Sequence, residues 1–136
     1  MNTSKGLRLK YKFWLETEEG ENLMGEGKWL LLKSIRDTGS IQSAVKDRGY
    51  AYRQTWDNLK KLEERLGFPV IHKIRGGEQG GHTRLTEKGE LIVSFFDSLY
   101  AQAEPELERV FQQMMAQLQR ISDNEDASND DAPEQL

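Results

Sequence analysis

The 136-residue chain contains no cysteine, only three prolines and two histidines. The lack of cysteine excludes a disulfide framework, a thiolate-bound zinc or iron–sulfur site and a thiol nucleophile. No apolar run approaches the roughly 20 residues that a membrane-spanning helix needs, and the polar residues 1–6 do not resemble a signal peptide. We therefore expect a soluble, cytoplasmic protein with no membrane association.

Residue patterns typical of metal sites and catalytic centres are also scarce. His72 and His82 stand alone, without the spacing of a metal-binding motif. The glutamates within 16–21 lack the spacing of a calcium-binding loop, and a solvated turn explains them better. No nucleophile elbow or equivalent catalytic motif is present. The sequence therefore predicts no enzyme activity, no metal and no cofactor.

Charge is distributed unevenly along the chain, although the net charge is only −4. Residues 28–88 carry 13 basic and 7 acidic side chains, whereas 16–27 carry five glutamates and 121–136 carry six acids and no base. A basic middle between acidic flanks suggests an anionic partner for the middle. Random clustering on a solvated surface produces similar patterns, so charge alone leaves both interpretations open.

The N-terminal region alternates apolar and basic residues, which predicts a half-buried β-strand over residues 7–15. The apolar face of this strand consists of Leu7, Leu9, Tyr11, Phe13 and Leu15. Leu23 and Met24 can form a short return strand after a polar turn.

Three helices are predicted next, over residues 28–38, 41–48 and 51–66, and each is followed by a glycine placed to end it. Ser40 is a suitable N-cap for the second of them. The third has Trp56, Leu59, Leu62 and Leu66 as its expected buried stripe.

Residues 70–74 and 83–85 can pair as a hairpin around a loop rich in glycine. Thr86 can then cap a long helix whose apolar positions step by three and four. Pro105 lies inside this helix, so we expect a kink or a break near Glu104. Residues 122–136 are polar and acidic, and we expect them to be disordered.

This order of elements predicts an α+β, mostly α fold: a winged helix-turn-helix with an N-terminal β-strand and a long C-terminal helix. The expected parts are an N-terminal strand region (1–24), a DNA-binding domain (25–85), dimerisation helices (86–121) and the acidic tail (122–136). A DNA major groove about 12 Å wide admits one α-helix, and the third helix combines an anchoring stripe with polar residues near its start.

We therefore predict a set of DNA contacts, with base contacts around Arg53 and backbone contacts elsewhere. The predicted residues are Ser40, Gln42, Ser43, Tyr52, Arg53, Gln54, Thr55, Lys60, Lys61, Arg75, Gln79, His82 and Arg84. Taken alone, the third helix also fits an ordinary amphipathic helix with a charged outer face. The capped short helix and the glycine before it favour the DNA-binding interpretation.

Four motifs in order resemble the N-terminal domain of the ModE family, bacterial and archaeal molybdate-responsive transcription regulators. They are Thr38-Gly39-Ser40-Ile41, Tyr52-Arg53-Gln54-Thr55-Trp56-Asp57, the segment Arg75 to Gly81, and Leu85-Thr86-Glu87-Lys88-Gly89. The resemblance covers roughly residues 23–100. It implies a winged helix-turn-helix related to that of LysR regulators, which binds palindromic operators as a homodimer.

The chain departs from the family pattern at three places. Ala51 stands where members usually have serine, and His82-Thr83 follow Gly80-Gly81 where the wing usually continues in glycine. Sensing members carry oxyanion-binding domains after the long helix, where this chain has its acidic tail, so molybdate sensing does not carry over and no small-molecule effector is assigned.

The predicted function is transcription regulation by a homodimer that binds double-stranded DNA. The apolar faces of residues 7–15 and of the helix after Thr86 are the expected dimer contacts. The alternative is a protein-interaction adaptor that keeps the winged-helix fold without binding DNA. Net acidity and the acidic tail favour this alternative, and the basic segment 28–88 opposes it.

Overall fold

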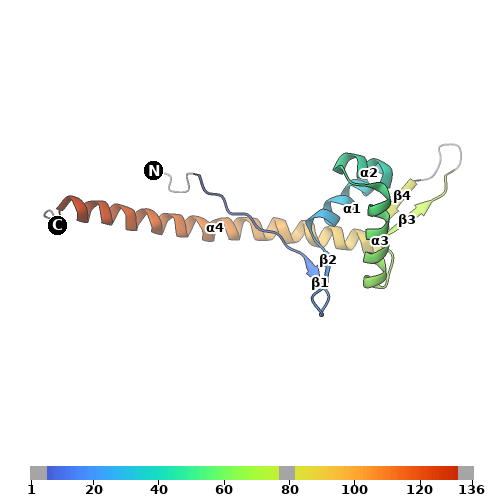
Figure 1. The fold of residues 1–136 in the computed structure, drawn as a ribbon, viewed down its shortest axis with the longest axis horizontal. Helices are drawn as coiled ribbons and strands as arrows, with labels where there is room; N and C mark the ends of the chain where they lie inside the picture. Colours follow the sequence, from blue (N-terminus) through green and yellow to red (C-terminus); the bar gives the residue numbers. More distant parts are fainter. Residues whose placement is uncertain (1–5, 77–81, 132–136) are drawn as a thin grey trace. The chain divides into compact units, whose positions relative to one another are not determined.

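The computed structural model describes residues 6–76 and 82–131, with side chains described as far as residue 127 (Figure 1). Two compact units are present, one formed by Lys12–Ser98 and the other by the two ends of the chain, Met1–Tyr11 and Leu99–Leu136. Within the described ranges, every helix is too short or too polar to cross a membrane.

The elements follow one another mostly as predicted, and the mostly helical α+β class is confirmed. In chain order they are β1 (Leu15–Glu16), β2 (Asn22–Met24), α1 (Glu26–Thr38), α2 (Ile41–Arg48), α3 (Tyr52–Leu66), β3 (Ile71–Ile74), β4 (His82–Leu85) and α4 (Glu87–Asp131). The strands form two antiparallel pairs, β1 with β2 and β3 with β4. In the second pair Ile71 lies opposite Leu85 and Ile74 opposite His82.

Glycines and a serine set the ends of the first three helices, as predicted. Gly39, Gly49 and Gly67 adopt left-handed φ angles of 72°, 71° and 82° at the three C-caps. Such angles strain residues that carry a Cβ, so glycine is favoured there. The Ser40 hydroxyl accepts a hydrogen bond from the Ser43 backbone N–H at 3.1 Å, which caps α2.

The core of the Lys12–Ser98 unit is formed by the inward faces of the four helices and both strand pairs. Its buried apolar residues are Met24, Leu31, Leu32, Ile35, Ile41, Ala44, Val45, Leu59, Leu62, Val70, Ile71, Leu85, Val93 and Phe96. Phe96 is fully buried, and its ring stacks against Trp29 of α1 with centroids 6.3 Å apart. This packing holds the first turns of α4 against α1.

Asp97 adds a polar link between α4 and α1 beside this aromatic pair. One of its carboxylate oxygens accepts hydrogen bonds from the Trp29 indole N–H at 2.9 Å and from Lys33 Nζ at 3.0 Å. Burial tends to raise the pKa of Asp97, but the hydrogen bonds from Lys33 and Trp29 and the nearby cations outweigh burial and lower it.

The backbone at Pro69–Val70 joins α3, the hairpin and α4. The Glu63 carboxylate on α3 accepts the Val70 N–H at 2.8 Å. The Val70 carbonyl accepts the Thr86 N–H at 2.9 Å, and the Thr86 hydroxyl donates to the Pro69 carbonyl at 2.8 Å. Thr86 also accepts the Gly89 N–H, which confirms the predicted cap of α4.

The predicted strand over residues 7–15 is wrong for most of its length. Only Leu15 and Glu16 are in β-structure, and the side chains of Leu7 and Leu9 are 54% and 39% exposed. The backbone N–H and C=O groups of a strand need a neighbouring strand for their hydrogen bonds. Strand β2 is so short that it pairs only with the end of this segment. In the unit formed by the chain ends, Tyr11 instead stacks on Tyr100 of α4, with ring centroids 6.1 Å apart.

The structure also corrects two expectations about the C-terminal helix. The expected break near Glu104 is wrong, because α4 continues through Pro105 and one lost backbone hydrogen bond does not end a helix that is held by turns on both sides; the alternative of a kink stays a prediction. It also continues to Asp131, so residues 122–131 are helical rather than disordered. Adding a residue to an existing helix costs much less free energy than forming the first turn. Polar residues can therefore extend a helix without being buried. Residues 132–136 lie outside the described residues.

Replacement of Gly89 by alanine is expected to destabilise the protein by about 1–3 kcal/mol, because overpacking forces the neighbours to move. A Cβ at this position would lie 2.2 Å from the buried Val70 carbonyl oxygen. Gly27→Ala is the matched control, since its Cβ would meet only the Tyr50 hydroxyl, at 3.6 Å. Urea unfolding monitored by circular dichroism measures both variants, and equal stability of the two would contradict the proposed packing.

Asp97→Asn is expected to lower the free energy of unfolding at neutral pH. In acid the variant and the wild type should become equally stable. Because folding lowers the pKa of Asp97, its stabilising contribution is present above the unfolded value of about 3.9 and disappears as the pH falls through the lower folded value. The difference in unfolding free energy between wild type and variant should therefore shrink as the pH falls below about 4. A difference that does not change between pH 7 and pH 3 would show that this carboxylate is not stabilised by folding.

Candidate functional site

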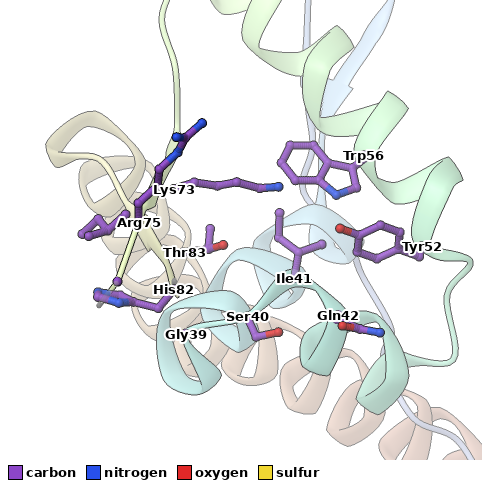
Figure 2. Close-up of a pocket in the computed structure, with 12 residues that line it drawn as sticks. Gly39, Ser40, Ile41, Gln42, Tyr52, Trp56, Lys73, Arg75, His82 and Thr83 are labelled. Carbon is purple, nitrogen blue, oxygen red and sulfur yellow. The ribbon is translucent and has the colours of Figure 1, made fainter. Parts of the chain in front are cut away.

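A hollow lies between the start of α2, the start of α3 and the β3–β4 hairpin (Figure 2). Its volume is about 470 Å³. The lining residues are Gly39, Ser40, Ile41, Gln42, Tyr52, Trp56, Lys73, Ile74, Arg75, Gly76, His82 and Thr83. This set includes Lys73, Arg75 and His82 but no carboxylate. The hollow therefore suits an anion better than a cation.

One wall of the hollow combines aromatic rings with a cation. Lys73 Nζ lies 4.4 Å from the centroid of the Trp56 ring, and Tyr52 meets Trp56 edge-on with centroids 6.4 Å apart. The two aromatic residues come from α3 and the lysine from β3, as Figure 2 shows. A cation over an indole face is attracted by the ring quadrupole, so this contact holds Lys73 beside the hollow.

A backbone hydrogen bond fixes the hairpin to the turn between α1 and α2. The Thr83 N–H of β4 donates to the Gly39 carbonyl at 2.8 Å, and the Thr83 side chain is buried. This bond places β4 beside the first residues of α2, where Ser40 caps the helix. The hairpin side and the α2 side of the hollow are therefore held together by a backbone hydrogen bond as well as by packing.

The outer face of α3 is open and carries charged residues of both signs. Arg53, Lys60 and Lys61 are exposed there, together with the acids Asp57 and Glu64. Thr55, Leu59 and Leu62 on the opposite face are buried in the core. The helix is thus anchored along one side and presents three cations and two acids along the other, beside the hollow.

The structure brings some of the predicted contact residues together and separates others. Those that line the hollow are Ser40, Gln42, Tyr52, Arg75 and His82. Those that are exposed elsewhere are Ser43, Arg53, Gln54, Lys60, Lys61 and Arg84. Gln79 lies outside the described residues.

Thr55 was expected to contact a partner, and the structure corrects this prediction. Its side chain is only 4% exposed and forms part of the core. The buried stripe of α3 begins at Thr55 and steps to Leu59 and Leu62, whereas Trp56, which we expected in this stripe, lies at its edge and is only half-buried. The prediction placed Trp56 in the core because tryptophan is the larger apolar residue. Tryptophan is large and has a polar N–H group, so it is often only partly buried, whereas the smaller threonine fits where the helices pack closely.

Lys73 and Trp56 are the two large polar or aromatic side chains of the hollow that were not among the predicted contacts. Ile71 and Lys73 lie two positions apart on β3 and therefore share one face of the hairpin, the face that packs on the helices. This alternation is visible in the sequence and places Lys73 toward the helices. Among the described residues, no three histidine, aspartate or glutamate side chains group as metal ligands would.

Comparison with known proteins finds relatives named for molybdenum transport, molybdenum-pterin binding or transcription regulation. The chain is 30% identical over 100 residues to the molybdenum transport protein ModE of Azotobacter vinelandii, which covers 74% of this chain and 37% of that protein. It is 33% identical over 78 residues to the molybdenum-pterin-binding protein MopB of Rhodobacter capsulatus, covering 57% and 29%. It is 32% identical over 69 residues to the DNA-binding transcriptional dual regulator ModE of Escherichia coli K12, covering 51% and 26%.

These matches span only about a quarter to a little over a third of each relative's length, from 26% to 37%. No family model matches the chain. By their names, the three relatives are a transport protein, a molybdenum-pterin-binding protein and a DNA-binding regulator.

Proposed function

This chain is a homologue of the ModE family, and on that premise we propose that it is a transcription regulator that binds duplex DNA through a winged helix-turn-helix. In this proposal α2 and α3 are the two helices of the motif, joined by residues 49–51, and the β3–β4 hairpin is the wing. A relative named as a DNA-binding regulator supports the proposal, because the match covers about half of this chain.

The observation that carries the proposal is the arrangement of cations around the start of α3. Arg53 is exposed in the first turn of a helix whose other face is anchored by Leu59 and Leu62. A helix held in this way can enter a major groove with its N-terminal residues toward the base edges. Arginine forms two hydrogen bonds to guanine O6 and N7, so Arg53 is the residue that we assign to base recognition.

We assign the hollow between α2, α3 and the hairpin to the DNA backbone. Lys73 and Arg75 supply positive charge there, and no carboxylate that would repel a phosphate is among the described residues of the lining. Ser40 and Gln42 at the start of α2 add polar groups at a helix end that favours anions. Lys60 and Lys61, further along α3, suit phosphates on the groove edge.

The proposal includes a homodimer formed through the C-terminal part of α4. The stripe Val110, Met114, Leu118 and Ile121 repeats at steps of four, four and three, and each of these side chains is about half exposed. Apolar residues at this spacing on one helix face match the seam of paired helices. A second copy of the chain is the proposed occupant, since a two-fold protein matches a palindromic DNA site.

Arg53→Ala is expected to weaken binding to the preferred DNA by about 1–3 kcal/mol and to relax the preference at one base pair. Lys60→Ala should weaken all sequences alike and reduce the slope of log K against log salt by about one unit, because one phosphate contact is lost. Fluorescence anisotropy on duplexes from upstream of the protein's own gene, from low to moderate salt, measures both effects.

Arg120→Ala is the control for this experiment, because Arg120 is exposed on α4, outside the proposed DNA-binding surface. Its affinity and salt slope should equal those of the wild type. If Arg53→Ala and Lys60→Ala also matched the wild type, or if the wild type bound no duplex, the groove assignment would be wrong and the adaptor alternative would gain support.

The double variant Met114→Glu/Leu118→Glu is expected to be monomeric at concentrations where the wild type is dimeric. Burial of a methionine or leucine side chain contributes roughly 1.5–3 kcal/mol, and the change removes two such side chains from each copy. Gln102→Glu/Gln113→Glu adds the same charge at exposed positions of α4 outside the stripe and should stay dimeric. Sedimentation equilibrium measures the oligomeric state of each variant. A wild-type protein that is monomeric at concentrations well above its dissociation constant for the operator would refute the dimer.

A further inference from the structure

A second pocket lies on the opposite flank of α3 from the hollow, between the start of α1 and the connection from α2 to α3. Its volume is about 300 Å³, and it lies entirely within the Lys12–Ser98 unit. Leu31 and Leu59, both buried, form an apolar floor. A volume of this size is at the lower end of the range for small-molecule sites.

The polar groups of this pocket are few and lie around its apolar floor. The Tyr50 hydroxyl lies beside Gly27, and the Gln54 side-chain amide donates to the Asn58 side-chain oxygen at 3.1 Å. Lys28 is the only charged residue of the described lining. A mostly apolar pocket with a few polar groups and one cation is the usual form of a site for a small amphipathic ligand.

Lys28 has hydrogen-bonding capacity to spare. Its Nζ donates to the Leu23 carbonyl at 3.0 Å, and an ammonium group carries three protons, so two remain for a ligand. Partial burial, and then the charge of Lys61, lowers the pKa of Lys28. Both effects disfavour its positive charge, and a bound anion would offset both.

From these observations we propose that the pocket binds a small organic monocarboxylic acid with a compact apolar or aromatic body. The carboxylate would pair with the Lys28 ammonium, and the apolar body would rest on Leu31 and Leu59. The described residues of the lining include one cation, Lys28, and no carboxylate, which favours a singly charged anion. The apolar floor selects against inorganic oxyanions, which have no apolar part to bury.

Gly27 offers a direct way to fill this pocket. It lies in α1 without a left-handed φ, and the only atom within 4 Å of a Cβ there would be the Tyr50 hydroxyl. A larger side chain is therefore compatible with the helix and would take up space in the pocket. Gln54 and Asn58 belong to α3, so a bound ligand would also change the affinity for DNA. That change in DNA affinity depends on the proposed function, whereas ligand binding itself does not.

The test is a titration of the full-length ¹⁵N-labelled protein with phenylacetate, followed by NMR, without DNA. Phenylacetamide is the matched neutral probe, since it has nearly the same shape without the charge. Phenylacetate should shift the amide signals of Lys28, Ala51, Gln54 and Leu59, which line the pocket. Phenylacetamide should bind about tenfold more weakly or worse, because its neutral amide replaces the charged carboxylate and the ion pair with Lys28 is lost.

Two variants locate the site and a third serves as a control. Lys28→Met should weaken phenylacetate binding by about tenfold or more, and Lys28→Arg should restore most of it. Gly27→Leu should abolish binding, and Gly27→Ala confirms that substitution at this position preserves the fold. Lys46→Met, an exposed lysine outside the pocket, should bind as the wild type does.

The proposal is overturned if phenylacetate leaves the pocket amides unshifted at millimolar concentrations, if phenylacetamide binds equally well, or if Lys28→Met binds as tightly as the wild type. Because no readout depends on DNA, failure of this proposal and failure of DNA binding are separate results.

Discussion

The backbone at Pro69–Val70, where Val70 is buried, is the junction on which the Lys12–Ser98 unit depends. The Glu63 carboxylate on α3 accepts the Val70 N–H, and the Val70 carbonyl accepts the Thr86 N–H at the start of α4. Gly89 allows α4 to come this close, since any Cβ there would collide with the Val70 carbonyl. One dipeptide therefore fixes the end of α3, the root of the hairpin and the first turn of α4 together.

This junction explains how cations from separate segments can act as one surface. The hairpin is tied to α3 at its root, and further along its length the Thr83 N–H ties β4 to the Gly39 carbonyl before α2. Lys73 is thereby held over Trp56, at the wall of the hollow. A surface that is organised before its partner arrives loses less conformational entropy on binding, which suits it to a fixed target such as a DNA groove.

The sequence predicted the helices and hairpin of this unit well because local signals specify them. Gly39, Gly49 and Gly67 end helices by their own conformation, and Ser40 caps α2 with its own hydroxyl. The predictions failed where the outcome depended on distant partners. Residues 7–14 alternate like a strand but lack a strand to pair with, and nothing in the α3 sequence says that its packing site has room for a threonine and not for Trp56. Five of the predicted contact residues line the hollow, and their role in binding stays a prediction, whereas Lys73 was found only once the hairpin's orientation was known.

The central claim is that α3 and the hollow beside it form one DNA-binding surface. The most direct test is an NMR map of the amide signals that move when a duplex from upstream of the protein's own gene is added. The largest changes are expected at the start of α2, on α3 from Tyr52 to Lys61 and on β3–β4, with little change in residues 110–121 of α4. Changes concentrated on α4, or a duplex that moves no signals, would contradict this claim.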